Sequence, residues 1–132
     1  MTTASTIIVL SGRYAVCRLP AAAVVPDWAT GEVASITRTA TELSIVCYEG
    51  AVPNGVRCEP GYRCLRVAGT LDFSEVGILA SLLGPLANAS VPVLALSTFD
   101  TDYLFVKEID LETTVGALRA AGHQVQHGSS WP

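Results

Sequence analysis

The chain has 132 residues, of which 50% are hydrophobic and 15% charged, with a formal net charge of -4 and a sequence pI near 5.0. This composition predicts a packed core and excludes an intrinsically disordered chain. The eight basic residues are scattered singly, so no clustered basic face is expected and nucleic-acid binding is disfavoured. By length the chain is one domain, or two very small ones that share a core.

Strand-like runs separated by turns fill the first half of the chain. We expect strands over residues 7–10 and 14–19, joined by a short turn, and a hairpin built from residues 33–38 and 42–47. Residues 48–61 hold two prolines and three glycines, which predicts a loop and a linker.

The second half opens on an amphipathic helix pattern. Asp72 can cap the helix, with Glu75 three residues later as in a capping box. Pro85 removes one backbone hydrogen bond, so the helix either kinks near Ser81 or ends early, and we favour the kink. The apolar side chains that share one helical face are Ile78, Leu79, Leu82, Leu83 and Leu86.

A hairpin and a second helix follow. Residues 91–98 and 102–106 are rich in β-forming side chains, and residues 99–101 have the composition of a turn. Asp110 can cap a helix over residues 111–121, with an inner face that contains Val115 and Leu118 and a stop at Gly122.

A short strand around Gln124 and Val125 completes the pattern. Together with a strand over residues 62–67 in front, the second half is expected to be β-α-β-β-α-β, the ferredoxin-like arrangement. The two hairpins are similar, which indicates a degenerate duplication. The predicted fold class is therefore α+β, with tandem half-domains that share an antiparallel sheet, helices on one face, and a first half that has lost most of its helices.

The N-terminal sequence and the cysteine spacing predict the cellular compartment. The first ten residues have no positive segment, and their apolar run is too short for a signal peptide or a membrane span. We therefore expect a cytoplasmic protein without membrane contact. Cys17, Cys47, Cys58 and Cys64 form no CxxC pair and are expected to be buried thiols.

Several of these segments resemble the small bacterial ACT-domain proteins, which are related to the ACT modules of the eukaryotic cytosolic arginine sensor. The resemblance covers roughly residues 13 to 123 and implies ACT-like half-domains, with 1–60 degenerate and 61–132 complete. It also implies a regulatory module that binds a free amino acid, acts at least as a homodimer and needs no cofactor. The segments that carry it are residues 14–20, 35–38, 42–46, 72–80 and 97–103.

The resemblance places the ligand beside the helix start and the facing hairpin. A helix N-terminus suits an α-carboxylate, and Glu75 could take an α-ammonium. Gly77 lets a ligand approach the backbone, and Asp102 could accept a guanidinium or a lysine ammonium. Arginine or lysine is therefore the expected ligand. The matching positions are Asp72, Glu75, Val76, Gly77 and Ile78 at the helix start, and Thr98, Phe99 and Asp102 on the hairpin.

Other interpretations of these residues stay open. Glu75 can be only a cap, Asp100 and Asp102 can stabilise a turn, and Phe99 can belong to the core. Pro92 lies, with Val93, where such relatives often carry a small polar residue, so either the ligand is held differently or the specificity has changed. The alternative function is an ACT-fold dimerisation scaffold with no small ligand.

Metal and catalytic chemistry have little support. His123 and His127 are four residues apart in an extended segment without a third ligand, which disfavours zinc. Asp100 and Asp102 could suggest magnesium or a transferase, but the chain has no phosphate-cradling loop, no GxSxG motif and no visible nucleophile–base pair. We expect neither a metal nor enzymatic activity.

Overall fold

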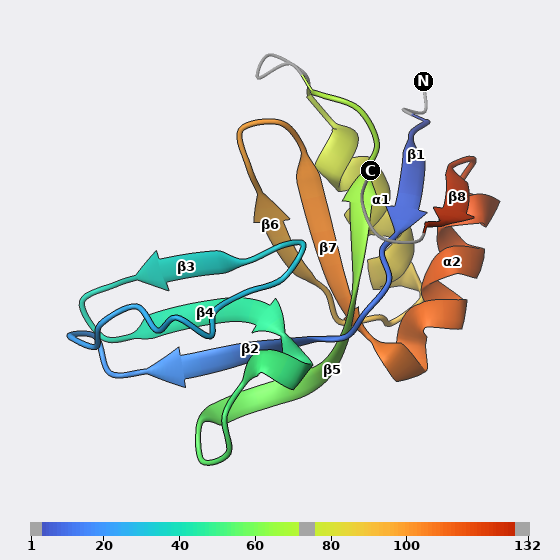
Figure 1. The fold of residues 1–132 in the computed structure, drawn as a ribbon. Coiled ribbons are helices and arrows are strands. Elements are labelled where there is room, and N and C mark those ends of the chain that lie inside the picture. Colours follow the sequence, from blue (N-terminus) through green and yellow to red (C-terminus); the bar gives the residue numbers. More distant parts are fainter. Residues whose placement is uncertain (1–3, 72–75, 129–132) are drawn as a thin grey trace. The chain divides into compact units, whose positions relative to one another are not determined.

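The computed structural model describes residues 4–71 and 76–128. The chain forms two compact units: unit 1 combines residues 1–11 with residues 63–132, and unit 2 is residues 12–62 (Figure 1). Unit 2 is thus inserted in the sequence of unit 1. The expected α+β class is confirmed, with eight strands and two α-helices in the described residues.

Unit 1 contains the predicted β-α-β-β-α-β order. After β5 come a helix, a hairpin, a second helix and a last strand, which confirms the ferredoxin-like pattern. The elements are β1 (Thr6–Val9), the last residues of β5 (Arg57–Val67), α1 (Ile78–Asn88), β6 (Leu94–Ser97), β7 (Asp102–Lys107), α2 (Leu111–Ala120) and β8 (Gln124–His127).

The sheet of unit 1 has the order β6-β7-β5-β1-β8. β1 lies between two strands from the second half: Ile7 is opposite Val67 of β5 in an antiparallel pair and opposite Val125 of β8 in a parallel pair. The predicted hairpin of residues 7–10 with residues 14–19 is therefore wrong, and the sheet is not purely antiparallel. Local alternation identified the strand but could not identify its distant partners.

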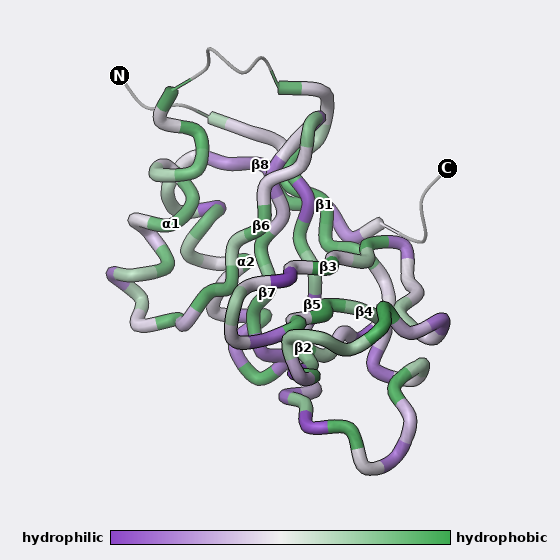
Figure 2. Tube along the Cα trace, turned by 90° about the vertical axis from the view of Figure 1, so that its left-hand side faces the viewer, coloured by the Kyte–Doolittle hydropathy of each residue, from purple (hydrophilic) through white to green (hydrophobic). Residues whose placement is uncertain are grey.

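Both helices pack on one face of this sheet. Alternate strand residues such as Ile7 and Val9 point to the helices, as the two-residue period of a strand requires. Figure 2 shows α1 mostly in the white-to-green hydrophobic range, and none of its residues is charged. The fully buried residues of this core include Ile7, Val9, Leu65, Leu82, Leu86, Leu104, Val106 and Leu118.

Helix α1 begins later than predicted. Its first residue is Ile78, and the residue before it is Gly77 at φ 83°, a left-handed conformation that glycine adopts without strain. The predicted cap Asp72 and its partner Glu75 lie outside the described residues, and the described helix does not include Val76 or Gly77. The helix continues through Pro85 to Asn88, so the early end is wrong.

Helix α2 confirms its predicted end but not its predicted cap. Val115 and Leu118 are buried, and the N–H groups of Gly122 and His123 bond to the carbonyls of Arg119 and Leu118 in a Schellman motif. Asp110 makes no side-chain capping bond. It ends a 3-10 turn with helical backbone angles, whereas a capping residue usually has extended ones.

Unit 2 is an antiparallel sheet with the strand order β3-β4-β2-β5. Its strands are β2 (Tyr14–Leu19), β3 (Ser35–Arg38), β4 (Leu43–Tyr48) and the first residues of β5. The β3–β4 hairpin confirms the predicted one, and the described residues of unit 2 form no α-helix. The proposed origin by duplication stays a prediction.

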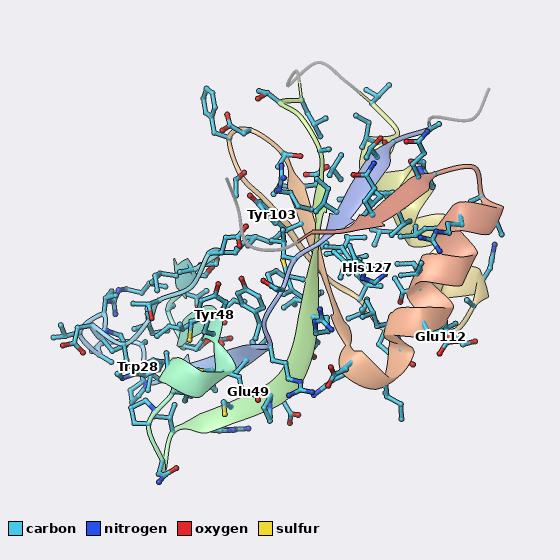
Figure 3. The ribbon with its side chains drawn as sticks, turned by 45° about the vertical axis from the view of Figure 1, so that its right-hand side comes forward. Trp28, Tyr48, Glu49, Tyr103, Glu112 and His127 are labelled. Atoms are coloured by element: carbon cyan, nitrogen blue, oxygen red, sulfur yellow. The ribbon has the colours of Figure 1, made fainter. Side chains whose placement is uncertain are left out.

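Strand β5 corrects the expected loop over residues 48–61, because the strand already starts at Arg57. The register between Tyr14 and Val16 of β2 shifts by one extra residue on β5, as in a β-bulge. Gly61 has φ +85°, and its N–H donates to Glu49 Oε1 at 2.7 Å; Figure 3 labels Glu49. The bulge accommodates the proline and glycine that indicated a loop.

Candidate ligand site

A cavity of about 320 Å³ lies in unit 1, where the start of α1 faces the tip of the β6–β7 hairpin. Two short segments and one residue of the chain after β5 form its wall. The lining residues are Leu71, Gly77, Ile78, Leu79, Ala80, Ser97, Thr98, Phe99, Asp100, Thr101 and Asp102.

The hairpin turn is closed by hydrogen bonds between its two ends. The Thr98 N–H donates to the carbonyl of Thr101 at 2.9 Å, and the Thr98 hydroxyl accepts the Thr101 N–H at 3.3 Å. At the strand ends, Ser97 Oγ donates to Asp102 Oδ1 at 2.6 Å, in keeping with the register that places these residues opposite each other. The Asp102 carboxylate is therefore oriented before any ligand arrives.

The hairpin tip is also fixed to the strand beside it. Thr101 is 5% exposed, and its hydroxyl donates to the carbonyl of Val67 at 2.7 Å. The Leu71 N–H donates to the carbonyl of Asp100 at 2.7 Å. These two bonds hold the acidic tip against the end of β5 and give the cavity a defined wall.

The opposite wall is the N-terminus of α1. The first intrahelical bond runs from the Ser81 N–H to the Gly77 carbonyl at 2.9 Å, so the N–H groups of residues 78–80 precede the helical ladder. These N–H groups, together with the helix dipole, give this wall a partial positive charge. A Cβ at Gly77 would meet nothing within 4 Å, so its glycine is explained by backbone angle rather than by crowding.

The charges of the cavity differ from wall to wall. Its described lining contains two carboxylates, Asp100 and Asp102, and neither lysine nor arginine. Carboxylates attract a cationic group, while the helix start attracts an anionic one. The cavity thus suits a small zwitterion that carries an extra positive charge.

The structure brings together five of the eight predicted site residues, namely Gly77, Ile78, Thr98, Phe99 and Asp102. Val76 is described but does not line the cavity, and its side chain is 86% exposed. Asp72 and Glu75 lie outside the described residues. The ligand-binding role of all eight stays a prediction.

Other wall residues were missed by sequence reasoning. Ser97 could have been found by counting the hairpin register back from the turn, because it pairs with Asp102. Leu71 and Thr101 had no such signal, since their positions depend on hydrogen bonds to the hairpin tip and to β5. Pro92 and Val93, the departure from the expected pattern, do not line this cavity.

The described part of the chain offers no metal centre, and its buried histidine has a structural role. It contains no group of three His, Cys, Asp or Glu residues placed to hold a metal ion. His123 is 4% exposed and lies between the main-chain groups of Ser5 and Ser81, which explains its presence structurally. None of the described helices is long and apolar enough to cross a membrane.

Comparison with known proteins identifies the kind of domain that this part of the chain forms. The ACT domain family model matches residues 57–120, which hold β5, α1, the β6–β7 hairpin and α2. This part of the chain is an ACT domain. A second family model, for an N-terminal domain, matches residues 12–55 and so falls within unit 2.

Two solved structures show how far the similarity of this ACT-domain protein extends. A protein from Agrobacterium tumefaciens is 39% identical, with a TM-score of 0.91 and coverage of 96% of both chains. The regulatory subunit of aspartate kinase from Thermus thermophilus has a TM-score of 0.57 at 9% identity, covering 83% of this chain and 91% of that one. The second comparison shows a shared fold only.

A further relative has a name that states what it senses. The human cytosolic arginine sensor for mTORC1 subunit 1 is 36% identical over 59 residues. That match covers 44% of this chain and 18% of the human protein, so the chain spans less than a fifth of the relative's length.

Proposed function

We propose that this ACT-domain protein is a regulatory module that binds a free cationic amino acid, arginine or lysine, in the cavity between α1 and the β6–β7 hairpin. The observation that carries the proposal is the pair of Asp100 and Asp102 opposite a helix N-terminus, without a basic residue in the described lining. The α-carboxylate would lie at the helix start and the side-chain cation at the carboxylates. The name of the partial human relative supports arginine in particular.

The proposed role is regulation without catalysis. Binding stabilises the folded protein by mass action, by about 2.7 kcal/mol when the free ligand is at 100 times its dissociation constant. That free energy is available to shift an interface or a partner. We assign the chain no reaction and no cofactor of its own.

We also propose that the module acts at least as a homodimer. Helix α1 carries no charged side chain, and its outward positions Ala80, Gly84 and Ala87 are small and exposed. Such a surface permits close approach of another helix or sheet. Light scattering after size-exclusion chromatography, with and without arginine, measures the number of chains in the assembly. A monomer at all concentrations would contradict the proposed homodimer.

Calorimetric titration of the purified protein tests the ligand. L-arginine and L-lysine are expected to bind, whereas citrulline, which lacks the guanidinium charge, should bind at least tenfold more weakly because the carboxylates lose a charge-assisted partner. The dicarboxylic glutamate should not bind measurably.

Two matched variants locate the site. Asp102→Asn keeps the side-chain shape, removes its charge and is expected to weaken arginine binding by about 2 kcal/mol, or roughly thirtyfold. Asp110→Asn makes the same change outside the cavity lining and should keep the wild-type affinity. Wild-type affinity in Asp102→Asn would remove Asp102 from the site. A chain that binds none of the amino acids would favour the dimerisation scaffold.

A further inference from the structure

Three of the four cysteines gather on one face of the unit 2 sheet. Cys17 of β2 and Cys47 of β4 lie in a hydrophobic cluster against which Cys58 of β5 packs. The thiols of Cys47 and Cys58 both act electrostatically on the Cys17 thiol, in keeping with their packing around it. Trp28, labelled in Figure 3, packs on the same cluster. Since the described residues offer no set of metal ligands, the relevant chemistry of this cysteine cluster is that between thiols.

The strand register distinguishes the possible pairs. Cys17 and Cys58 are directly opposite each other across the antiparallel β2–β5 pair. Opposite residues in such a pair have Cα atoms about 4.5 to 5.5 Å apart, which lies within the range of about 4.4 to 6.8 Å found in disulfides. Cys47 is opposite Ala15, so it is a diagonal neighbour of Cys17 at about 7 to 8 Å. The register therefore favours a bond between Cys17 and Cys58.

Exposure gives the three thiols different roles. Cys17 is 1% exposed and Cys47 is 0% exposed, whereas Cys58 is only partly buried. A small reagent in solvent reaches Cys58 first. Burial, reinforced by the neighbouring thiols, raises the pKa of Cys17 to about 12, so this inner thiol reacts slowly at neutral pH.

We propose that Cys58 and Cys17 form a reversible modification site for small disulfides, in which Cys58 reacts first and Cys17 resolves the adduct. This site is independent of the proposed amino-acid cavity, since its residues belong to unit 2. It gives unit 2 a chemical role of its own.

The reaction balances in two thiol–disulfide exchanges. The Cys58 thiolate attacks one sulfur of glutathione disulfide, a mixed disulfide forms on Cys58, and one glutathione thiolate leaves. The Cys17 thiolate then attacks the Cys58 sulfur, the Cys17–Cys58 bond forms and the second glutathione thiolate leaves. Two protein thiols are oxidised, one glutathione disulfide is reduced to two glutathiones, and the thiol protons end on the leaving groups.

The pH dependence of the second exchange follows from the buried thiol. Below its pKa the thiolate fraction of Cys17 rises tenfold with each pH unit, so closure should be about thirtyfold faster at about pH 9 than at about pH 7.5. The mixed disulfide is expected to accumulate at the lower pH and the internal disulfide at the higher one.

The test incubates the reduced protein with glutathione disulfide at both pH values. Samples are quenched in acid, alkylated and mapped as unreduced peptides by mass spectrometry. Wild type should give a Cys58 adduct and then a Cys17–Cys58 cross-link. Cys17→Ser should stop at the adduct and Cys58→Ser should give neither product, whereas the control variants Cys47→Ser and Cys64→Ser should follow wild type.

Several outcomes would overturn the proposal. These are a first adduct on another cysteine, a cross-link between Cys17 and Cys47, and an adduct on Cys58 of wild type that never closes at about pH 9. Because Cys17 is buried, Cys17→Ala serves as a second trapping variant, with circular dichroism to show that both are folded.

Discussion

The Nε2 atom of His123 lies 3.0 Å from the main-chain oxygen of Ser81, the carbonyl that Pro85 leaves without a helical donor. On the other side of the ring, Nδ1 accepts the Ser5 N–H at 3.1 Å. Because Nδ1 is the acceptor, the proton lies on Nε2 and donates to Ser81. One buried imidazole thus bonds to the segment before β1 and to the middle of α1, from the end of α2.

This relationship predicts coupling between His123 and Pro85. His123→Leu should lower the free energy of unfolding by about 2 to 3 kcal/mol, because a partly buried carbonyl and a partly buried N–H lose their partner. In the Pro85→Ala background the loss should be about 1 kcal/mol smaller, since position 85 regains an N–H that can bond to the Ser81 carbonyl. Urea unfolding of the four proteins measures the cycle; additive losses would contradict the shared carbonyl.

Introducing glycine after α1 and removing it after α2 should have opposite effects on the free energy of unfolding. Ser90 follows α1 with φ 60° and forms the same Schellman bonds as Gly122 after α2. Ser90→Gly should raise the free energy of unfolding by about 1 kcal/mol, because a left-handed backbone strains L side chains. Gly122→Ser, the matched reverse change, should lower it by a similar amount. Thermal melting checks both, and a destabilised Ser90→Gly would refute the strain.

Thr114 predicts a stabilising substitution. Its side chain in α2 is fully buried, and its Oγ1 has no hydrogen-bond partner among the described residues. Thr114→Val keeps the branched shape and removes the buried hydroxyl, so the free energy of unfolding should rise by about 1 kcal/mol. The exposed neighbour gives the control, because Thr113→Val should change stability by less than about 0.5 kcal/mol. A less stable Thr114→Val would reveal an unseen partner, such as an ordered water.

Ser97 predicts a smaller effect on the proposed ligand than Asp102. Ser97→Ala removes the hydroxyl that orients the Asp102 carboxylate but leaves its charge. Arginine affinity should fall about fivefold, or about 1 kcal/mol, against about thirtyfold for Asp102→Asn. The same calorimetric titration compares them. An unchanged affinity in Ser97→Ala would show that the ligand does not need this orientation.

The buried Cys17 predicts loss of stability at alkaline pH. Its pKa is about 12 in the folded protein against an ordinary 9.0, so the unfolded chain ionises first as the pH rises. The resulting stabilisation is complete below about pH 9 and is lost as the pH rises from about 9 to about 12. Relative to Cys17→Ser, which does not titrate there, wild type should lose up to about 1.4 kcal/mol per pH unit. Urea unfolding in reductant measures this difference; a constant difference would contradict the shift.

The sequence predicted what depends on local patterns. Alternation and turn residues located the β6–β7 hairpin, whose register places Ser97 opposite Asp102, and Gly122 marked the end of α2. The start of α1 at Ile78 was not predicted, because the capping-box pattern of Asp72 and Glu75 carries no information on the left-handed backbone of Gly77. Only the backbone conformation of Gly77 identifies the actual start.

The features that the sequence did not predict depend on contacts between distant segments. No local signal shows that Ile7 pairs with Val67 and Val125, because register is fixed across the sheet. The same holds for Thr101, which became a wall residue through its bond to Val67. The hairpin and the helix start of the candidate site were therefore visible in the sequence, whereas the positions of Leu71 and Thr101 required the assembled sheet.

The position of β1 also determines the order in which the two units can fold during synthesis. The ribosome makes this strand before either of its two partners, which are the end of β5 and the strand β8. Until residues 124–127 emerge, one edge of β1 has no strand to bond with, and bare edges promote aggregation. Unit 2, which is contiguous in sequence, can fold earlier on the nascent chain. Unit 1, which carries the candidate cavity, can be completed only after residues 124–127 have emerged.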